Sequence, residues 1–348
     1  MAAERLLRDW YEGARWLHLL RPLAWLFRTI VRRRRRQYLG QKEQLWQSPA
    51  PIIIVGNITL GGTGKSPLVA TLVRQLREMG WRPGIISRGY GGRAPQYPML
   101  VTPESDPDES GDEPLMLARQ CGCPVVVDPL RVNAARHLLE QTDCNLILSD
   151  DGLQHYALRR DLEIVVLDGR RGLGNGWCLP AGPLREPPER LGSVDLIVTN
   201  GKLERSLPTF NGAASAKGEG SGFPATWEMH LQPTMLVRLI DGQELSVEAM
   251  AGQTVHAVAG IGNPDRFFRT LESLGLRVIP HAFADHHRYN RQDLAYDDDL
   301  PILMTEKDAV KWREFANERM YALRVEARLA PGFFQRLESL LATVRPEH

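Results

Sequence analysis

Short apolar runs alternate with helical patterns through the middle of this chain. From residue 51 to about residue 200 these runs are IIIV, PGIIS, CPVVV, NLILS, EIVVL and DLIVT, each about the length of one buried strand. Strands that are apolar on both faces and alternate with helices are typical of a parallel sheet covered by helices on both sides. The pattern therefore predicts an α/β domain here.

A second, smaller α/β unit is predicted toward the C-terminus. ATWEMHLQ and TMLVRLI look like two extended strands around Pro233, and a new strand–helix alternation follows from TVHAVAGIG to PILMTEKDAVKW. Residues 205–225 lose all periodicity and are rich in Gly, Ala and Ser, as in a loop or linker. We expect three segments: residues 1–42, 43–224 and 225–348.

The first segment has an amphipathic helical pattern over residues 5–31. One face of the predicted helix carries Leu6, Trp10, Leu17, Leu20, Ala24, Phe27 and Val31. No charge-free run approaches the roughly 18–20 residues that span a bilayer. Two interpretations follow: an interfacial helix with this face in lipid and Trp10, Trp16 and Trp25 at headgroup depth, or a helix packed on the body and kinked or broken at Pro22.

Charge favours the membrane interpretation. The 348 residues include 43 basic and 42 acidic side chains, yet residues 1–42 alone carry +8 and the remainder carries −7. The acidic remainder excludes a uniformly basic nucleic-acid-binding protein, and the basic arm has either a membrane surface or another polyanion as its partner. Five consecutive arginines, 32–36, and three tryptophans exceed what docking on the body requires. We expect residues 1–36 to hold the protein on a membrane, peripherally or monotopically.

Several familiar sites are disfavoured. The four cysteines contain no CxxC pair and no zinc-like spacing, which is typical of ordinary thiols in a reducing compartment. FADHHRY offers Asp285, His286 and His287 without a third ligand at a recognisable spacing, so zinc is disfavoured. Gly260 and Gly262 lack the third glycine of a dinucleotide-binding fingerprint, so NAD binding is not predicted.

A phosphate-binding loop is the strongest local signal. The apolar strand PIIIVGN is followed by ITLGGTGKSP and then by the helical pattern LVATLVRQLREMG. In such a P-loop the glycines let backbone N–H groups approach phosphates, Lys65 supplies charge to the β/γ-phosphates, and the Ser66 hydroxyl can bind Mg²⁺. The strict P-loop pattern has glycine where this chain has Thr59.

Carboxylates lie where ligand chemistry gathers in α/β sheets, at the carboxyl ends of strands. NLILS is followed at once by Asp150 and Asp151, whose mutual repulsion argues for a bound cation. The segment SGDEP, residues 110–114, opens a predicted helix with Asp112 near its N-terminus, and LPAGPLREP places Glu186 in a Pro/Gly-rich loop. These residues extend the predicted phosphate site into a candidate active site.

The ordered segments VGNITLGGTGKSP, SRGYGG, GDEP, SDDGLQH, LPAGPLREP, FADHH and TEKDAVK resemble the tetraacyldisaccharide 4′-kinase family over essentially the whole chain. The resemblance implies transfer of the ATP γ-phosphate to the 4′-hydroxyl of a tetraacylated diglucosamine 1-phosphate, a lipid A precursor, at the cytoplasmic face of the inner membrane. It also implies a P-loop kinase-like domain, a smaller α/β lobe and a two-stranded β linker. No nucleic acid and no obligate protein partner is implied.

The same resemblance implies roles for individual residues. The ATP-binding loop would consist of Thr59, Leu60, Gly61, Gly62, Thr63, Gly64, Lys65 and Ser66. Ser66 and Glu186 would hold Mg²⁺, and Asp150 and Asp151 would line the metal and γ-phosphate site. Asp112 would be the general base, supported by His286 from the second lobe.

A different class of protein is an alternative. Membrane-associated P-loop ATPases that position chromosomes or septa have a related loop, and some use an amphipathic helix on membranes. Their signature lysine falls at Leu60 in this chain, and LPAGPLREP and FADHH have no role in such a switch. The two classes differ in whether ATP turnover requires a glycolipid and phosphorylates it.

Overall fold

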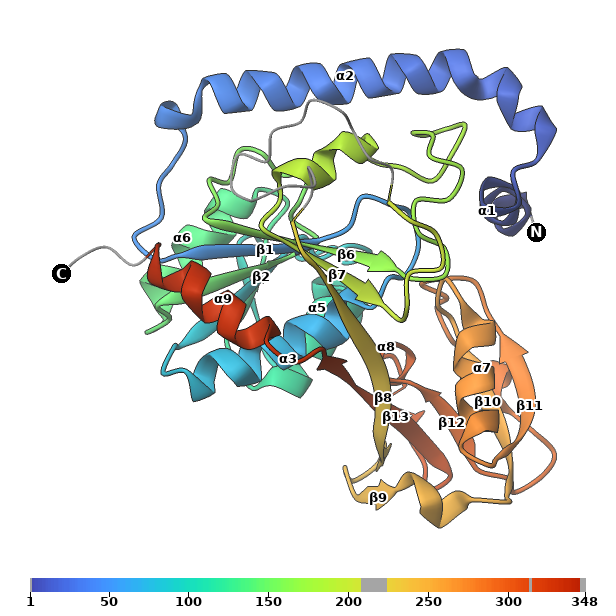
Figure 1. Ribbon diagram of the computed structural model, residues 1–348. Helices are drawn as coiled ribbons and strands as arrows, with labels where there is room; N and C mark the ends of the chain where they lie inside the picture. Colours follow the sequence, from blue (N-terminus) through green and yellow to red (C-terminus); the bar gives the residue numbers. More distant parts are fainter. Residues whose placement is uncertain (1, 208–223, 313–314, 345–348) are drawn as a thin grey trace.

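The computed structural model describes residues 2–207, 224–312 and 315–344 (Figure 1). The strands are β1 (Ile52–Gly56), β2 (Pro83–Ser87), β3 (Met99–Val101), β4 (Val125–Val127), β5 (Leu146–Asp150), β6 (Leu162–Asp168), β7 (Leu196–Asn200), β8 (Thr226–Arg238), β9 (Glu244–Ser246), β10 (Thr254–Ala259), β11 (Arg277–Ala282), β12 (Ile302–Thr305) and β13 (Met320–Leu329). The α-helices are α1 (Ala2–Glu12), α2 (Arg21–Gly40), α3 (Lys65–Glu78), α4 (Pro107–Ser110), α5 (Asp112–Cys121), α6 (Arg131–Gln141), α7 (Pro264–Ser273), α8 (Glu306–Ala309) and α9 (Phe333–Ala342). Short 3₁₀ helices are η1 (Arg15–Leu20), η2 (Lys42–Gln44), η3 (Pro188–Ser193), η4 (Val247–Met250) and η5 (Arg291–Leu294).

The first lobe is built on the predicted parallel sheet. Its strand order is β7-β6-β1-β5-β2-β4-β3, parallel throughout except for the antiparallel edge strand β3. The central strands β1, β5 and β6 are buried along their whole length, which explains their unbroken apolar sequences. Helices α3, α5 and α9 pack on one face of this sheet and α6 packs on the other (Figure 1).

The second lobe continues the same sheet through β8. Strands β11, β10, β12 and β13 run parallel to one another, and β13 pairs antiparallel with β8, which in turn runs parallel to β7. The prediction of two separate strands around Pro233 is therefore wrong, because residues 226–238 form one strand, β8. Pro233 lacks an N–H, and the pairing of β8 with β13 shifts register beside it, between Arg324 and Val325, which accommodates the proline.

The chain returns to the first lobe at its C-terminal end. The side chains of Phe333, Leu337 and Leu341 on α9 are buried in the same core as α3 and α5. The sequence patterns assigned all of residues 225–348 to the β linker and the second lobe, but α9 belongs to the first lobe. The predicted linker, 205–225, lies mostly outside the described residues.

The N-terminal arm consists of two α-helices, α1 and α2, with the 3₁₀ helix η1 between them. The predicted single helix over residues 5–31 ends at Gly13, whose φ of 75° is left-handed, and Pro22 lies in the first turn of α2 instead of kinking a longer helix. Helix α2 then crosses the upper side of the first lobe (Figure 1). The arm is attached by ion pairs from Arg28 and Arg32 to Glu189.

The apolar face that the sequence assigned to lipid packs on the body. Trp10, Leu17 and Ala24 are all at most 5% exposed, and the Trp10 indole donates a hydrogen bond to the Pro180 carbonyl. A second set of apolar side chains, on the outer side of the arm, is exposed instead: Trp16, Leu19, Leu23, Trp25, Leu26, Ile30 and Leu39. No helix among the described residues combines the length and the apolar character that crossing a bilayer requires.

Candidate active site

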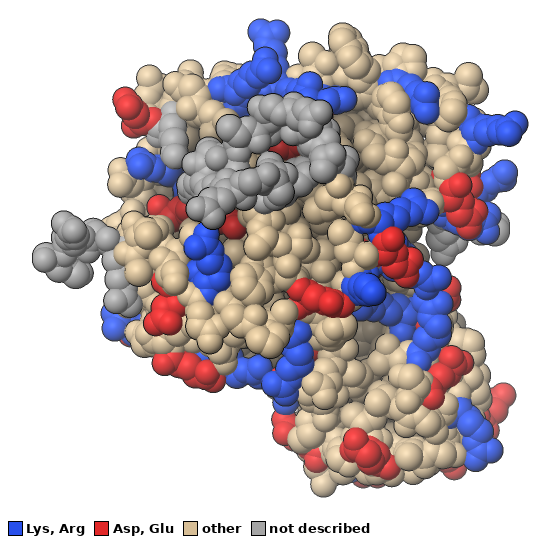
Figure 2. All heavy atoms as spheres, viewed as in Figure 1, with Lys and Arg blue, Asp and Glu red and all other residues tan. Residues whose placement is uncertain are grey.

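A cleft of about 840 Å³ lies between the two lobes. The first lobe lines it with the P-loop, the end of β5 and the loop around Arg185, and the second lobe lines it with residues 261–263, 266–267, 285–286 and 305–307. The lobes come close together across it, since a Cβ added to Gly262 would lie 3.6 Å from the backbone nitrogen of Gly62. Figure 2 shows basic and acidic side chains facing one another where the lobes meet.

The P-loop has the predicted strand–loop–helix setting. β1 leads into it, and α3 begins at Lys65 directly after Gly64, which caps the helix with a left-handed φ of 90°. Six of its eight predicted residues line the cleft, whereas Thr59 and Thr63 are buried beneath it. Backbone N–H groups at the start of a fourteen-residue helix therefore open into the cleft, as an anion-binding loop requires.

Asn200, at the end of β7, holds the loop from below. Its amide nitrogen donates to the Thr63 carbonyl at 3.1 Å, and it would lie only 2.7 Å from a Cβ at Gly64. Its amide oxygen accepts a hydrogen bond of 2.7 Å from Arg266 of the second lobe. The lack of a side chain at Gly64 thus serves this close approach as well as the left-handed backbone.

Asp151 joins two cations of the cleft. The Lys65 ammonium lies 3.5 Å from its Oδ1, and the Arg185 guanidinium donates to its Oδ2 at 2.9 Å. Burial alone would raise the pKa of this carboxyl, but Lys65 and Arg185 lower it to about 2. Its φ of 48° is unusual for a residue with a side chain, a strain that active sites often retain.

Asp150 is a buried carboxylate without a partner of its own. Neither of its oxygens accepts a hydrogen bond from the described residues, and burial followed by repulsion from Glu113 raises its pKa to about 7. Two unpaired carboxylate oxygens beside the P-loop fit a hard cation such as Mg²⁺. No three His, Cys, Asp or Glu side chains of the described residues form a metal-binding group, so such a cation would also need oxygens from Ser66 or from a bound phosphate.

Asp112 and His286 meet across the lobes, 174 residues apart in the chain. Nδ1 of His286 lies 3.0 Å from Oδ2 of Asp112, the first residue of α5. His286 lines the cleft with a left-handed φ of 59°, and its ring lies 5.1 Å from that of Tyr90 in the SRGYGG segment. The predicted base and its predicted partner are therefore in contact.

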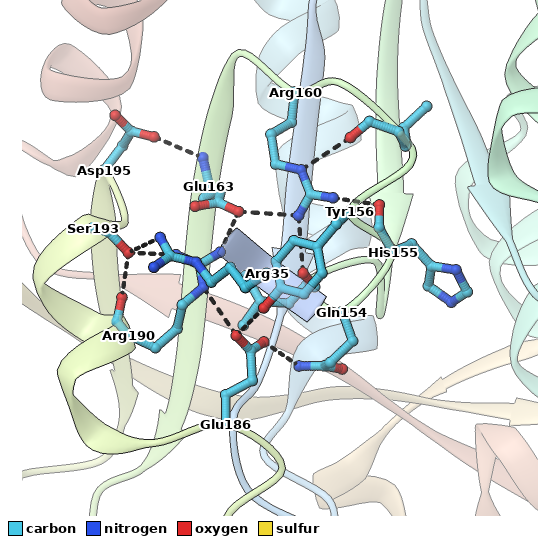
Figure 3. A network of polar contacts seen from close by, with 12 residues as sticks. Arg35, Gln154, His155, Tyr156, Arg160, Glu163, Glu186, Arg190, Ser193 and Asp195 are labelled. Atoms are coloured by element: carbon cyan, nitrogen blue, oxygen red, sulfur yellow. Dashed lines mark hydrogen bonds and ion pairs between the residues drawn. The ribbon is translucent and has the colours of Figure 1, made fainter. Parts of the chain in front are cut away.

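Glu186 lies beside this cleft and not in its lining, in a network of polar contacts under α2 whose member Gln154 does line the cleft (Figure 3). The carboxylate is fully buried and accepts hydrogen bonds from Gln154 at 2.8 Å, from Arg190 at 3.1 Å and from the Tyr156 hydroxyl. Both oxygens are engaged, and it is not among the residues that line the cleft. The predicted Mg²⁺-binding role of Glu186 has no support in this arrangement.

Arg190 neutralises two buried carboxylates in this network, Glu186 and Glu163. Arg190→Met would leave both without their main cation, so we expect a loss of about 3–5 kcal/mol in the free energy of unfolding. Urea unfolding followed by circular dichroism measures it. In the control Arg159→Met, whose hydrogen bond to Gln47 is exposed, we expect about 0.5 kcal/mol or less; equal losses in both variants would contradict the assignment.

The sequence patterns did not predict several basic residues in and beside the cleft. Arg131 is buried and donates to the Asp150 carbonyl at 3.0 Å, and burial lowers its pKa to about 10. Lys307 and Lys311 surround the Asp112–His286 pair, and Arg266 reaches Asn200. TEKDAVK was the available signal for the two lysines, but nothing local indicates that Arg131 or Arg266 faces the cleft.

A protein with this fold around such a cleft is a P-loop phosphotransferase. Backbone N–H groups and Lys65 can hold nucleotide phosphates, while the Asp112 carboxylate, in contact with His286 of the other lobe, can receive a hydroxyl proton.

Comparison with known proteins identifies the family. The family model described as Tetraacyldisaccharide-1-P 4′-kinase matches residues 16–342. Similar relatives are the tetraacyldisaccharide 4′-kinases of Pseudomonas aeruginosa (strain LESB58), 49% identical over 98% of this chain and 99% of that one, and of Pseudomonas fluorescens (strain SBW25), 48% identical over 99% and 98%. The chain belongs to the tetraacyldisaccharide 4′-kinase family. It is an ATP-dependent kinase that phosphorylates the 4′-hydroxyl of the lipid A precursor.

A solved structure agrees with the fold. The crystal structure of "apo" form LpxK from Aquifex aeolicus in complex with ATP superimposes with a TM-score of 0.78 at 27% identity, covering 94% of this chain and 99% of that chain. The mixed α/β architecture with a large, mainly parallel sheet is therefore that of the family.

Proposed function

We propose that this kinase transfers the γ-phosphate of Mg²⁺–ATP within the interlobe cleft to a glycolipid presented by a membrane surface. The observation that carries the proposal is the placement of the P-loop and His286 in one cleft, with the two lobes contributing opposite walls and Asp112 in contact with His286 beside the cleft-lining Glu113. The paired strands β8 and β13 would act as the linker between the lobes.

The first lobe would bind the nucleotide. The N–H groups of residues 60–66 and the Lys65 ammonium would hold its phosphates, and Arg185 would keep Asp151 ionised beside them. Asp150 and Ser66 would hold Mg²⁺, which supplies charge neutralisation for the transferring phosphoryl group. The role of Glu186 would be structural, because it anchors the loop that follows Arg185 to the network under α2.

The acceptor hydroxyl would meet Asp112. Burial would raise the pKa of this carboxyl, but the hydrogen bond from His286 and the charge of Lys311 lower it, so Asp112 is ionised at neutral pH. An ionised carboxylate can accept the hydroxyl proton late in phosphoryl transfer, when the oxygen has become acidic.

The outer face of the arm would seat the enzyme on the bilayer at the cytoplasmic face of the inner membrane. Four exposed apolar residues, Leu19, Leu23, Leu26 and Ile30, follow one another at spacings of four, three and four, and basic side chains lie along α2 (Figure 2). An apolar stripe beside arginines is the pattern of a helix that lies in an anionic interface.

Replacing this stripe is expected to release the protein from membranes. In Leu23→Ser/Leu26→Ser/Ile30→Ser we expect binding to anionic liposomes at least about 100-fold weaker, since each residue contributes up to roughly 1.5–3 kcal/mol on burial. Liposome sedimentation measures it, with Leu100→Ser, an exposed leucine of β3, as the control. Removing residues 1–36 should also release the protein, but it would uncover the surface that Trp10 and Leu17 bury; unchanged sedimentation of the triple variant would contradict the proposal.

The reaction itself distinguishes this proposal from a membrane-bound ATPase switch. With ATP, Mg²⁺ and tetraacyldisaccharide 1-phosphate, we expect a product phosphorylated at the 4′-position. ATP hydrolysis that proceeds equally without the glycolipid, and leaves it unmodified, would favour the switch.

A further inference from the structure

Two lysines of the second lobe, Lys307 and Lys311, enclose the Asp112–His286 pair, and of their contacts the function proposed above uses only the charge of Lys311. Lys307 is the second residue of α8, and Lys311 follows that helix. Their side chains are only 14% and 9% exposed. Long cationic side chains are rarely this buried without specific partners, so the contacts of each ammonium are informative.

The Lys307 ammonium has three acceptors around it. It lies 3.0 Å from Oδ1 of Asp285, 3.3 Å from Oε1 of Glu113 and 3.3 Å from Nε2 of His286. An ammonium group has three donors and no acceptor, so the imidazole nitrogen that faces it must accept. Nε2 is then unprotonated, and Nδ1 carries the proton that His286 donates to Asp112.

The Lys311 ammonium contacts the base directly. It lies 2.9 Å from Oδ2 of Asp112 and 3.2 Å from the His287 carbonyl, above the ring of Tyr289. Oδ2 thus contacts both the Lys311 ammonium and Nδ1 of His286, while Oδ1 accepts no hydrogen bond from the described residues. The second oxygen of the carboxylate is the one left for an incoming hydroxyl.

We propose that Lys307 and Lys311 are positioning residues that set the proton arrangement of the catalytic base. Lys307 selects the neutral Nδ1–H form of His286, and Lys311 holds Asp112 as an anion through Oδ2, which leaves Oδ1 to accept a hydroxyl proton. Both lysines belong to the second lobe and Asp112 to the first, so the base is complete only where the lobes touch. This inference rests on the proposed role of Asp112.

The charges around Asp112 determine the expected pH dependence. His286 and Lys311 contact its carboxylate directly. Lys307 contacts His286 and pairs with Glu113, and the Tyr289 ring lies under the Lys311 ammonium. An opposite charge in contact with a carboxylate lowers its pKa by about 1–3 units. Removing Lys311 therefore raises the pKa of Asp112, and the base loses its ionised form at a higher pH than before.

The first experiment is the pH profile of kcat/KM for glycolipid phosphorylation. In Lys311→Met the acidic limb is expected to move upward by about 1–3 pH units with KM for ATP unchanged, and Lys311→Arg, which keeps the charge, should restore most of the shift. The matched control is Lys202→Met, an exposed lysine of the first lobe outside the cleft, which should keep the wild-type profile. An acidic limb that stays in place in Lys311→Met would overturn the role of Lys311.

The second experiment needs no substrate, and so separates this inference from the proposed function. Imidazole ¹⁵N spectra of the intact protein labelled at histidine, with His286 assigned from its loss in His286→Gln, should show Nδ1 protonated and Nε2 unprotonated. Lys307→Met should shift this pattern toward Nε2–H or imidazolium. Nε2–H in the wild-type protein, or an unchanged spectrum in Lys307→Met, would overturn the role of Lys307 even if the kinase reaction is as proposed.

Discussion

Replacing Lys65 with alanine is expected to reduce kcat by about 10³-fold or more, the scale of the effect of single cations on phosphoryl transfer. Lys65 is the first residue of α3 and lines the cleft, and its ammonium lies 3.5 Å from Oδ1 of Asp151. Phosphoryl transfer depends mainly on positioning and on neutralising charge, so the loss of this cation affects the transition state directly. Steady-state assays with ATP and the glycolipid measure the effect.

The fold should survive this replacement, because Asp151 keeps its contact with Arg185 at 2.9 Å. A thermal melt within about 2 °C of the wild type would show that the fold is intact, since about 1 kcal/mol shifts Tm by roughly 2–4 °C in proteins of about 150–250 residues and by less in a longer chain. Lys202→Ala, a change of the same kind at an exposed site, should retain full activity. Substantial phosphorylation of the glycolipid by Lys65→Ala would remove this residue from the phosphate site.

Asp112→Ala is expected to lower kcat by about 10²–10⁴-fold, the usual contribution of a general base, while ATP binding survives. The reason is spatial: Asp112 lies at the start of α5, where His286 and Lys311 from the second lobe meet it, and the nucleotide loop contacts neither oxygen of its carboxylate. Titration with a fluorescent ATP analogue separates binding from turnover.

His286→Ala provides the graded comparison for this prediction. It removes the hydrogen bond to Asp112 but leaves Lys311 at 2.9 Å, so the carboxylate stays ionised and the loss of kcat should be smaller. Near-normal turnover in Asp112→Ala would exclude it as the base. A silent His286→Ala would leave Asp112 as the base without its predicted partner.

Membership in the family accounts for the reaction, and the geometry adds how its two halves depend on one another. Asn200 holds the P-loop and accepts a hydrogen bond from Arg266 of the second lobe, and Asp112, the proposed base, contacts Lys311 of the same lobe. Both halves of the reaction therefore involve contacts that cross the cleft.

Local sequence patterns predicted those features that depend on a short stretch of chain. A wholly apolar strand before a glycine-rich turn and a helix is sufficient to place Lys65 and Ser66 at a phosphate site, because every part lies within about 25 residues. Adjacent carboxylates after an apolar strand likewise placed Asp150 and Asp151 at the carboxyl end of β5.

Features that depend on contacts between distant segments could not be predicted in this way. The roles suggested for Asp112 and His286 came from resemblance, and their contact joins residues 174 positions apart. For Glu186 the resemblance suggested a metal-binding role, but its carboxylate accepts hydrogen bonds from Arg190, Gln154 and Tyr156 instead. Its sequence position beside Arg185 gives no sign of these contacts.

The sequence by itself determined the class of fold, the nucleotide loop and an amphipathic, basic arm, because periodicity and local motifs reflect backbone geometry over a few turns. Only the tertiary structure decided which face of that arm is buried, that β8 is one strand, and which charges surround the base. These outcomes depend on which surfaces meet after folding. The arm carries two sets of apolar side chains, and the sequence alone does not distinguish the set that packs on the body from the set that stays exposed.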